Sequence, residues 1–289
     1  MAITRQGSNL PNGSYIPDIW SKKLLKKFYA ASICNIICNT DWQGEVVNGQ
    51  KVLIRQRPDL FVEPYVANQK TNWQDILDIS QNLTIDYAFV AAAKLDVVDM
   101  HQMDINLQAE LIDEIANRLR LVIETTVLGS AYSSAGTSLS AVAWQTSTNC
   151  MDAIAQAQAA LSVTTEPAPV TERYLVLHPS MSRYLIQQAG LYALNAGLPQ
   201  SAMVKGSVNN LANFDFYQTP LVPGAGTTGS PFKAFAGHKV AITLATQFTQ
   251  FETNIPLVDY VGKGIRAINC FGYKVVKPSA LVYMPSTIS

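Results

Sequence analysis

The sequence predicts an α+β protein in which one long helix and one long β-hairpin stand outside any compact core. Two apolar patterns carry this prediction. A helical period runs from Asp104 to Leu128, and a two-residue period surrounds the dipeptide Asn48-Gly49 and returns at Leu83–Phe89. Beyond Thr148, short helical and alternating segments follow one another, and no period of about 20 to 50 residues repeats. This excludes a repeat architecture.

Composition narrows the class further. The 289 residues suffice for one large domain or two ordinary ones, and 48% apolar residues exclude a disordered chain. Only 15% of residues are charged, against about 25% in an average soluble protein. The 21 basic and 21 acidic side chains cancel, so the net charge gives no general attraction to nucleic acid or acidic lipid.

Amides take the place of charges, with 17 Asn and 18 Gln in the chain. Amides hydrogen-bond without the desolvation cost of an ion, which suits a surface covered by a neighbour. The charges also concentrate in the first 124 residues, and the remainder holds only 9 basic and 6 acidic side chains. We therefore expect an oligomer.

The N-terminal region divides into an arm and a helix. Residues 1–16 are rich in Gly, Asn, Ser and Pro, and Pro17 then suits the first turn of a helix. Apolar residues recur at helical spacing on one face (Trp20, Leu24, Leu25, Phe28, Tyr29, Ile33, Ile36), and Lys22, Lys23, Lys26 and Lys27 occupy the other. The lysines suit a solvated helix face, and also a contact with phosphate.

Two alternating segments predict the hairpin. Glu45–Val47 and Gln50–Arg55 flank Asn48-Gly49, which favours a tight turn, and Leu83–Phe89 supplies a further strand. Between Arg55 and Leu83 lie Pro58, Pro64 and an amide-rich stretch, so we expect a polar tip without a core of its own.

The long helix has a recognisable start and end. Asp104 is a good N-cap, and Gly129 follows the last apolar residue of the pattern. A helix over residues 104–128 is about 37 Å long. Glu114 and Arg118 are spaced for an ion pair on its outer face.

The C-terminal half predicts mixed structure: a helix over Met151–Leu161, a strand over Arg173–Leu177, a helix that begins at Ser180, and alternating segments around Val240–Thr243 and Tyr273–Val276. Residues 224–229 match the dinucleotide-binding string G-x-G-x-x-G. The string requires a preceding strand and a following helix, whereas Pro223 and Pro231 border it here. We expect a flexible surface loop.

Catalytic and metal-binding patterns are largely absent. Cys34, Cys38, Cys150 and Cys270 form no metal-like spacing with the three histidines, so we expect buried reduced thiols. Acids around the helix start (Asp96, Asp99, Asp104, with His101) fit an N-cap and first turn better than a divalent-metal site. We expect no catalytic residue, no cofactor and no metal. A carboxylate-based site stays open as the less favoured alternative.

No apolar run is long enough for a bilayer span, and the first residues lack an apolar signal core, so we expect a protein made in the cytoplasm without a membrane partner.

Three segments resemble one protein family. Ile16–Leu25 is similar to the opening of tailed-phage coat proteins, and Arg173–Pro179 resembles their strand-to-helix segment. The ending is the most specific part, because residues 234–242, 260–267 and 271–278 resemble the close of major capsid proteins with the Hong Kong 97 fold. The resemblance spans nearly the whole chain.

The resemblance implies five parts. Residues 1–43 would form the N-terminal arm and first helix, 44–93 an extended hairpin called the E-loop, 94–145 the peripheral domain with its long spine helix, 146–259 the axial domain, and 260–289 a return to the peripheral domain. A long hairpin and a long helix suit a shell in which neighbouring subunits cover them.

The implied function is structural: a major capsid protein that self-assembles into the icosahedral head around double-stranded phage DNA, located in the virion after assembly in the bacterial cytoplasm. An encapsulin-type protein cage is the first alternative, and a soluble oligomeric enzyme is the second. Implied partners are the protein itself as pentamers and hexamers, a portal protein, a cement protein and DNA through non-specific contacts. We also expect a separate scaffolding protein, because residues 1–16 are too short for a fused scaffold.

Two surfaces are the candidate sites. Lys22, Lys23, Lys26 and Lys27 are expected on the inner surface, where they would contact an acidic scaffold and later DNA. The E-loop tip is expected to contact a neighbouring subunit through Tyr65, Asn68, Gln69, Lys70, Asn72 and Trp73.

Overall fold

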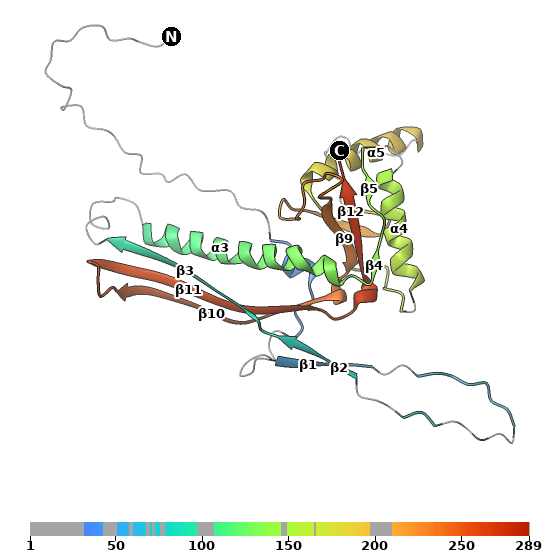
Figure 1. The fold of residues 1–289 in the computed structure, drawn as a ribbon, viewed down its shortest axis with the longest axis horizontal. Helices are drawn as coiled ribbons and strands as arrows, with labels where there is room; N and C mark the ends of the chain where they lie inside the picture. Colours follow the sequence, from blue (N-terminus) through green and yellow to red (C-terminus); the bar gives the residue numbers. More distant parts are fainter. Residues whose placement is uncertain are drawn as a thin grey trace, which may run out of the picture.

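The structure is a computed structural model that describes residues 32–42, 51–57, 60–67, 70, 73–75, 79–96, 107–145, 149–164, 166–196 and 210–288. Figure 1 shows three parts. A long helix lies along a narrow three-stranded sheet, a compact region of mixed helices and strands stands at one end of this layer, and a hairpin projects away from both. No helix among the described residues is long and apolar enough to cross a membrane.

The long helix is α3 (Leu107–Ser130), and it covers one face of the sheet β10-β11-β3 (Figure 1). The three strands are β3 (Tyr87–Asp96), β10 (Ile242–Pro256) and β11 (Gly262–Val275), all antiparallel to their neighbours. A narrow seam of apolar side chains joins the two layers: Ile115 and Leu119 from α3 pack on Leu95, Ile265 and Ala267. Small residues in the sheet let the helix approach closely.

The predicted long helix is confirmed, and its observed bounds are close to the predicted ones. It ends at Ser130 instead of Leu128, and residues 104–106 of the prediction lie outside the described residues. Ser130 adds a hydrogen bond from its hydroxyl to the Thr126 carbonyl in the last turn. The predicted ion pair is present, with Arg118 Nε 3.1 Å from Glu114 Oε1.

The compact region is built on a seven-stranded sheet in the order β4-β12-β9-β6-β8-β7, with β5 also paired to β12. Its strands are β4 (Thr137–Ser138), β5 (Val142–Ala143), β6 (Arg173–Leu177), β7 (Asn210–Leu211), β8 (Phe214–Gln218), β9 (Phe232–His238) and β12 (Leu281–Thr287). Helices α4 (Asn149–Val163) and α5 (Pro179–Ala196) complete it, with short 3-10 turns at 131–134, 239–241 and 278–280. The main hydrophobic core lies here, around fully buried Trp144, Phe214 and Phe235.

The strand Arg173–Leu177 and the two helices around it match the sequence prediction. Two other strands lie in a different sheet from the one that the predicted domain boundaries imply. Strand β10 falls within residues 146–259, yet it pairs with β11 beside α3. Strand β12 falls within 260–289, yet it pairs with β9 in the seven-stranded sheet. The chain therefore crosses between the two regions more often than a simple division predicts.

The cysteines are free thiols. Three of them are buried as expected, and burial raises the pKa of the Cys150 thiol. Cys270 is only half-buried, because it sits on the sheet face opposite α3. The prediction of buried thiols therefore holds for Cys34, Cys38 and Cys150, and is wrong in part for Cys270.

Candidate functional site

The E-loop hairpin is anchored to the body of the subunit by its paired strands, residues 51–56 and 79–84, which we call its root. Strand β1 (Lys51–Gln56) pairs antiparallel with β2 (Ile79–Thr84). Val52, Ile54 and Leu83 are buried in a small cluster of their own against Ala245 and Val276. This packing fixes the direction in which the hairpin leaves the body.

Polar contacts reinforce this root. The side-chain amides of Gln56 and Gln81 donate to the carbonyl oxygen of Val276, at 3.4 and 3.2 Å, and Lys274 Nζ donates to the Asn82 carbonyl at 2.9 Å. Where the chain crosses the sheet, a side chain at Gly272 would clash with the Thr84 carbonyl. Glycine permits this close approach of two backbones.

The sequence prediction of a single strand over Leu83–Phe89 is wrong at its centre. The chain breaks at Ile85-Asp86, so β2 belongs to the hairpin and β3 to the sheet beside α3. The Thr84 hydroxyl donates to Asp86 Oδ2 at 2.5 Å across this break. Residues 43–50, which include the predicted turn Asn48-Gly49, lie outside the described residues.

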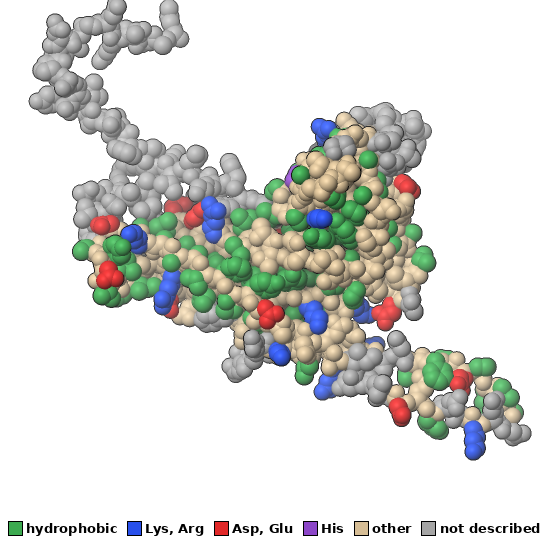
Figure 2. Space-filling model, in the orientation of Figure 1, with side chains coloured by type: hydrophobic (Ala, Val, Ile, Leu, Met, Phe, Trp, Pro, Cys, Tyr) green, Lys and Arg blue, Asp and Glu red, His purple; other side chains and the backbone are tan. Residues whose placement is uncertain are grey.

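The far part of the hairpin exposes large apolar side chains. Val62 is 94% exposed, Tyr65 90% and Trp73 93%, and Leu60, Phe61 and Val66 are also exposed. The side-chain amide of Gln74 holds the two branches together, because it accepts from the Phe61 N–H at 3.2 Å and donates to the Phe61 carbonyl at 2.7 Å. In Figure 2, hydrophobic side chains lie along this projecting loop at lower right, separated from the body of the molecule.

Of the predicted contact residues in this loop, Tyr65, Lys70 and Trp73 are described and exposed. Asn68, Gln69 and Asn72 lie outside the described residues. The sequence prediction overlooked Leu60, Phe61 and Val62. A signal was present, because three consecutive large apolar residues between Pro58 and Pro64 have no place in a polar tip.

A second exposed apolar group lies at the far end of the sheet, where β10 turns into β11. Val258 is 99% exposed, and Tyr260 and Val261 are exposed beside it. Lys94 Nζ lies 4.0 Å from the centre of the Tyr260 ring, a cation–π contact that holds the ring in place. The sequence analysis did not identify this group, although valines in a turn between two strands are unusual.

The predicted basic face, Lys22, Lys23, Lys26 and Lys27, lies outside the described residues. The first described residue is Ser32. Hydrogen bonds to the buried carboxylate of Glu124 in α3 fix the chain at this residue and at the two that follow. Glu124 Oε1 accepts from the Ser32 hydroxyl at 2.5 Å and from the backbone N–H groups of Ile33 and Cys34 at 3.0 and 2.9 Å. These bonds satisfy the first free N–H groups of α1 (Cys34–Ile37), as an N-cap does.

The glycine-rich string at 224–229 forms a tight turn instead of the flexible loop that we expected. Backbone hydrogen bonds join Ala225 and Thr227 to Ser230, and the Ile288 N–H donates to the Gly226 carbonyl at 2.8 Å. Gly224 and Gly226 have φ of 123° and 74°, which glycine adopts without strain. Strand β9 follows instead of a helix, so the turn lacks the helix N-terminus of a dinucleotide site.

Within the described ranges no group of three or more His, Cys, Asp or Glu could hold a metal ion, and of the acids near the helix start only Asp96 is described. The two described histidines have structural contacts: Nδ1 of His178 accepts from the Ser180 N–H and Nδ1 of His238 from the Val240 N–H, both at 3.2 Å. Burial lowers the pKa of both imidazoles.

Comparisons with known proteins agree with this geometry. Residues 83–284 match the family described as phage capsid protein. Mycobacterium phage Che8 has a solved structure with a TM-score of 0.81 at 22% identity, and the match covers 95% of this chain and 98% of that one. The capsid of cyanophage P-SCSP1u gives a TM-score of 0.77 at 14% identity, with 95% and 94% covered. The mature capsid of bacteriophage PhiM1 gives 0.71 at 14%, with 94% and 92% covered.

No curated protein shows significant sequence similarity to the chain. The structural matches at these identities establish the Hong Kong 97 fold, and the family match establishes the role. That role is structural, not enzymatic. The chain belongs to the phage capsid protein family and is a major capsid protein that forms the head shell of a bacteriophage virion.

Proposed function

We propose that the subunits join into pentamers and hexamers chiefly through the E-loop hairpin, whose far part lies on a neighbouring subunit. The single observation that supports this most strongly is the exposure of Val62, Tyr65 and Trp73 on a projection without a core of its own. Exposed apolar patches of this kind mark protein interfaces, and aromatic residues are the usual anchors.

Charge is spread along this loop and does not separate one face from another, because Glu63, Lys70 and Asp75 alternate with apolar residues. Apolar groups lose little on desolvation, so the exposed apolar side chains are the groups that we propose to lie at the centre of the contact. The exposed group at Val258, Tyr260 and Val261 would form a second contact between subunits, at the opposite end of the molecule from the E-loop (Figure 1).

Electron cryomicroscopy of purified heads tests this arrangement. The proposal predicts that Tyr65 and Trp73 each lie within contact distance of another subunit. A map in which both side chains face solvent in every subunit of the shell would contradict it.

We further propose that a separate scaffolding protein guides assembly and that the face with Lys22, Lys23, Lys26 and Lys27 points inward. A closed shell places identical chains in unequal positions, so one sequence can close into several wrong sizes unless a second factor sets the curvature. Four lysines on one helical face would attract first an acidic scaffold and then DNA phosphates, at distances within about 10 Å. A portal protein and a cement protein complete the partners that we propose.

Changing the four lysines together to glutamine tests this assignment. Glutamine keeps the length and the helix propensity and removes the charge. The variant is expected to fold normally, and to give a larger fraction of aberrant or unfilled heads by electron microscopy and DNA content. An unchanged yield of filled heads would contradict the lysine assignment. Uniform heads of native size from this chain expressed alone would contradict the separate scaffold.

A further inference from the structure

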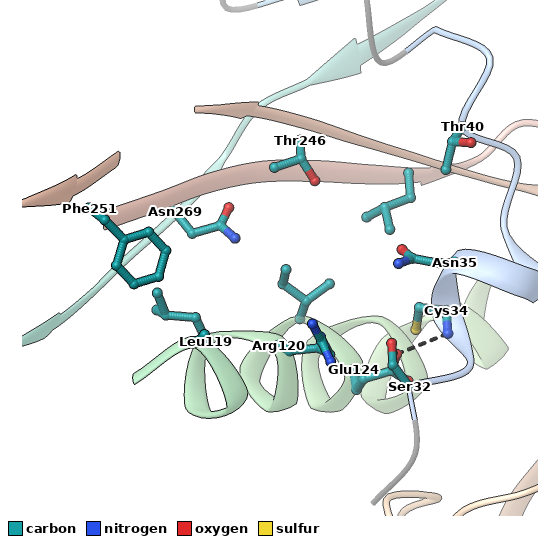
Figure 3. Close-up of a pocket in the computed structure, with 13 residues that line it drawn as sticks. Ser32, Cys34, Asn35, Thr40, Leu119, Arg120, Glu124, Thr246, Phe251 and Asn269 are labelled. Carbon is teal, nitrogen blue, oxygen red and sulfur yellow. Dashed lines mark hydrogen bonds between the residues drawn. The ribbon is translucent and has the colours of Figure 1, made fainter. Parts of the chain in front are cut away.

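The three-stranded sheet beside α3 has two outer strands, β10 and β3, and their outer edges differ. The edge of β10 is partly covered, because the Asn39 N–H donates to the Ile242 carbonyl at 2.8 Å and the Leu244 N–H donates to the Asn39 carbonyl at 2.9 Å. A cavity of about 500 Å³ lies between α3 and the strands β10 and β11, with Arg120 of the helix and Asn269 of the sheet among its lining residues (Figure 3). This side of the sheet is therefore occupied in part by the chain itself.

The opposite edge, along β3, has no such cover among the described residues. Strand β3 pairs with β11 over its full length, from Tyr87 to Asp96. No other described strand pairs with it, and no backbone hydrogen bond outside that ladder involves residues 87–95. A strand directs its backbone N–H and C=O groups alternately to its two sides. About half of these groups in residues 87–95 therefore have no backbone partner within the described chain.

Strand β3 also lacks the features that protect most exposed edges. Such strands usually carry charges, prolines or bulges that prevent pairing with another chain. The ladder of β3 on β11 has no register shift, and residues 87–93 contain neither a charge nor a proline. On the sheet face opposite α3, Val90 is 62% exposed, and Ala88 and Ala92 are exposed on either side of it. This edge is suited to pairing with another strand.

The charges at the two ends of this segment indicate which strand fits. Asp86 directly precedes β3, Lys94 lies near its other end, and both are exposed. When two copies of β3 pair antiparallel about a two-fold axis at Val90, Lys94 of each copy lies opposite Asp86 of the other, because both are equally far from the axis. An axis at Ala91 would instead place Asp96 opposite Asp86. Opposite charges stabilise a cross-strand pair and like charges destabilise it, so the charges favour the axis at Val90.

Both charged groups can take a further partner. Lys94 Nζ lies 4.0 Å from the centre of the Tyr260 ring, and an ammonium group has three donors. Asp86 Oδ2 accepts from the Thr84 hydroxyl, and a carboxylate accepts several hydrogen bonds. The contacts within the chain therefore leave room for the pair between chains.

We propose that β3 pairs with β3 of a second subunit, antiparallel and about a two-fold axis at Val90, so that two three-stranded sheets join into one sheet of six strands. The partner is another copy of this chain, because a two-fold contact needs only one self-complementary surface. Rings of subunits also need a contact that joins one ring to the next, and a two-fold pair supplies it. The inference concerns a different surface from the E-loop and does not depend on the E-loop contact proposed above.

Cysteine crosslinking in purified, assembled heads tests the proposal. The background is Cys270→Ala, because Cys270 is only half-buried and lies opposite Ala88 in the same sheet. Val90→Cys places two thiols opposite each other at the axis, and a disulfide requires Cα atoms about 4.4–6.8 Å apart. Ala88→Cys and Ala92→Cys are the matched single controls, because each residue then lies about 14 Å from its own copy. Combined in one chain, the same two substitutions face each other across the axis.

Mild oxidation followed by non-reducing denaturing gel electrophoresis gives the fraction of linked dimers. The proposal predicts a dimer at least about tenfold more abundant in Val90→Cys, and in the combined Ala88→Cys, Ala92→Cys variant, than in either alanine position changed singly. Pairing raises the effective concentration only of thiols that face each other. The combined variant decides the question if Val90→Cys fails to assemble. Heads without a dimer, or equal dimer in all variants, overturn the proposal. A dimer from a single control with none from Val90→Cys overturns it as well, because the register would differ.

Discussion

The compact region and the E-loop hairpin both contain paired β-strands, yet they place their large side chains differently. Trp144 in the compact region is fully buried, whereas Trp73 in the hairpin is 93% exposed. The compact region forms one continuous core, and the hairpin has packed residues only at its root. The comparison teaches that the two regions are stabilised differently. The compact region is stabilised by side-chain packing within its own chain, whereas the far part of the hairpin requires contacts with a neighbouring subunit.

The largest expected effect comes from the two tryptophans. Trp144→Ala removes a ring from the packed core and should lower the free energy of unfolding by about 3–5 kcal/mol. Trp73→Ala removes a ring that contacts little within the subunit, and should change it by less than about 0.5 kcal/mol while lowering the yield of shells. Denaturant unfolding of the unassembled subunit and electron microscopy of the products measure the two quantities. Similar losses of subunit stability in both variants would contradict the claim that only the compact region is stabilised within its own chain.

The hairpin root should respond between these extremes. Leu83 is fully buried, but in the small cluster with Val52, Ile54, Ala245 and Val276. Leu83→Ala should therefore weaken this cluster by about 2–3 kcal/mol. Hydrogen exchange should accelerate in β1 and β2 and stay unchanged in β6 and β9. Leu53→Ala on the exposed face of β1 is the control and should leave exchange unchanged. Faster exchange throughout the chain would show that the root is part of the main core.

A smaller effect depends on pH and belongs to the compact region alone. Burial holds the pKa of His178 and His238 below the ordinary 6.5, and for His238 this outweighs the opposing charge of Glu172. The unfolded chain therefore binds protons that the folded chain does not, so stability falls as pH decreases below about 6.5 and is fully present above it. A proton on Nδ1 would also end the bond from Ser180 or Val240 N–H.

The double variant His178→Asn, His238→Asn tests this effect. An Asn carbonyl keeps an acceptor for the backbone N–H but does not titrate. Lost stacking of His178 on Phe232 gives an offset that is independent of pH. Thermal unfolding between pH 7.5 and 5 should show a steeper loss in the natural sequence than in the variant. Parallel curves would contradict the assignment to these two residues.

The sequence predicts the secondary structure of the compact region better than that of the E-loop hairpin. In the compact region Tyr174–Leu177 is a continuous apolar run, so the local pattern determines strand β6, as the long helical period determines α3 in the neighbouring layer. The break at Ile85-Asp86 has no local signal, because the alternation continues through it. It arises where the chain leaves the hairpin and joins β11 over Gly272, which is a tertiary contact.

The candidate site shows the same limit. Proline and amide residues indicated a projecting tip, and Tyr65 and Trp73 are exposed there. The apolar group Val258, Tyr260 and Val261 was not predicted, although valines in a turn between two strands are unusual, because its exposure becomes visible only in the arrangement of the described residues in space. Burial within one chain also says little about an assembly surface, which is defined by a second copy.

The central claim is that the E-loop hairpin is needed for the shell but not for the fold of the subunit. Deletion of residues 66–73 tests it most directly, because this segment lies beyond the packed root and beyond the pairing of Gln74 with Phe61. Sedimentation and circular dichroism of the natural chain and of the deletion variant should show equal secondary structure, with shells in the first case and only small species in the second. Closed shells of normal size from the deletion variant, or loss of its fold, would contradict the claim.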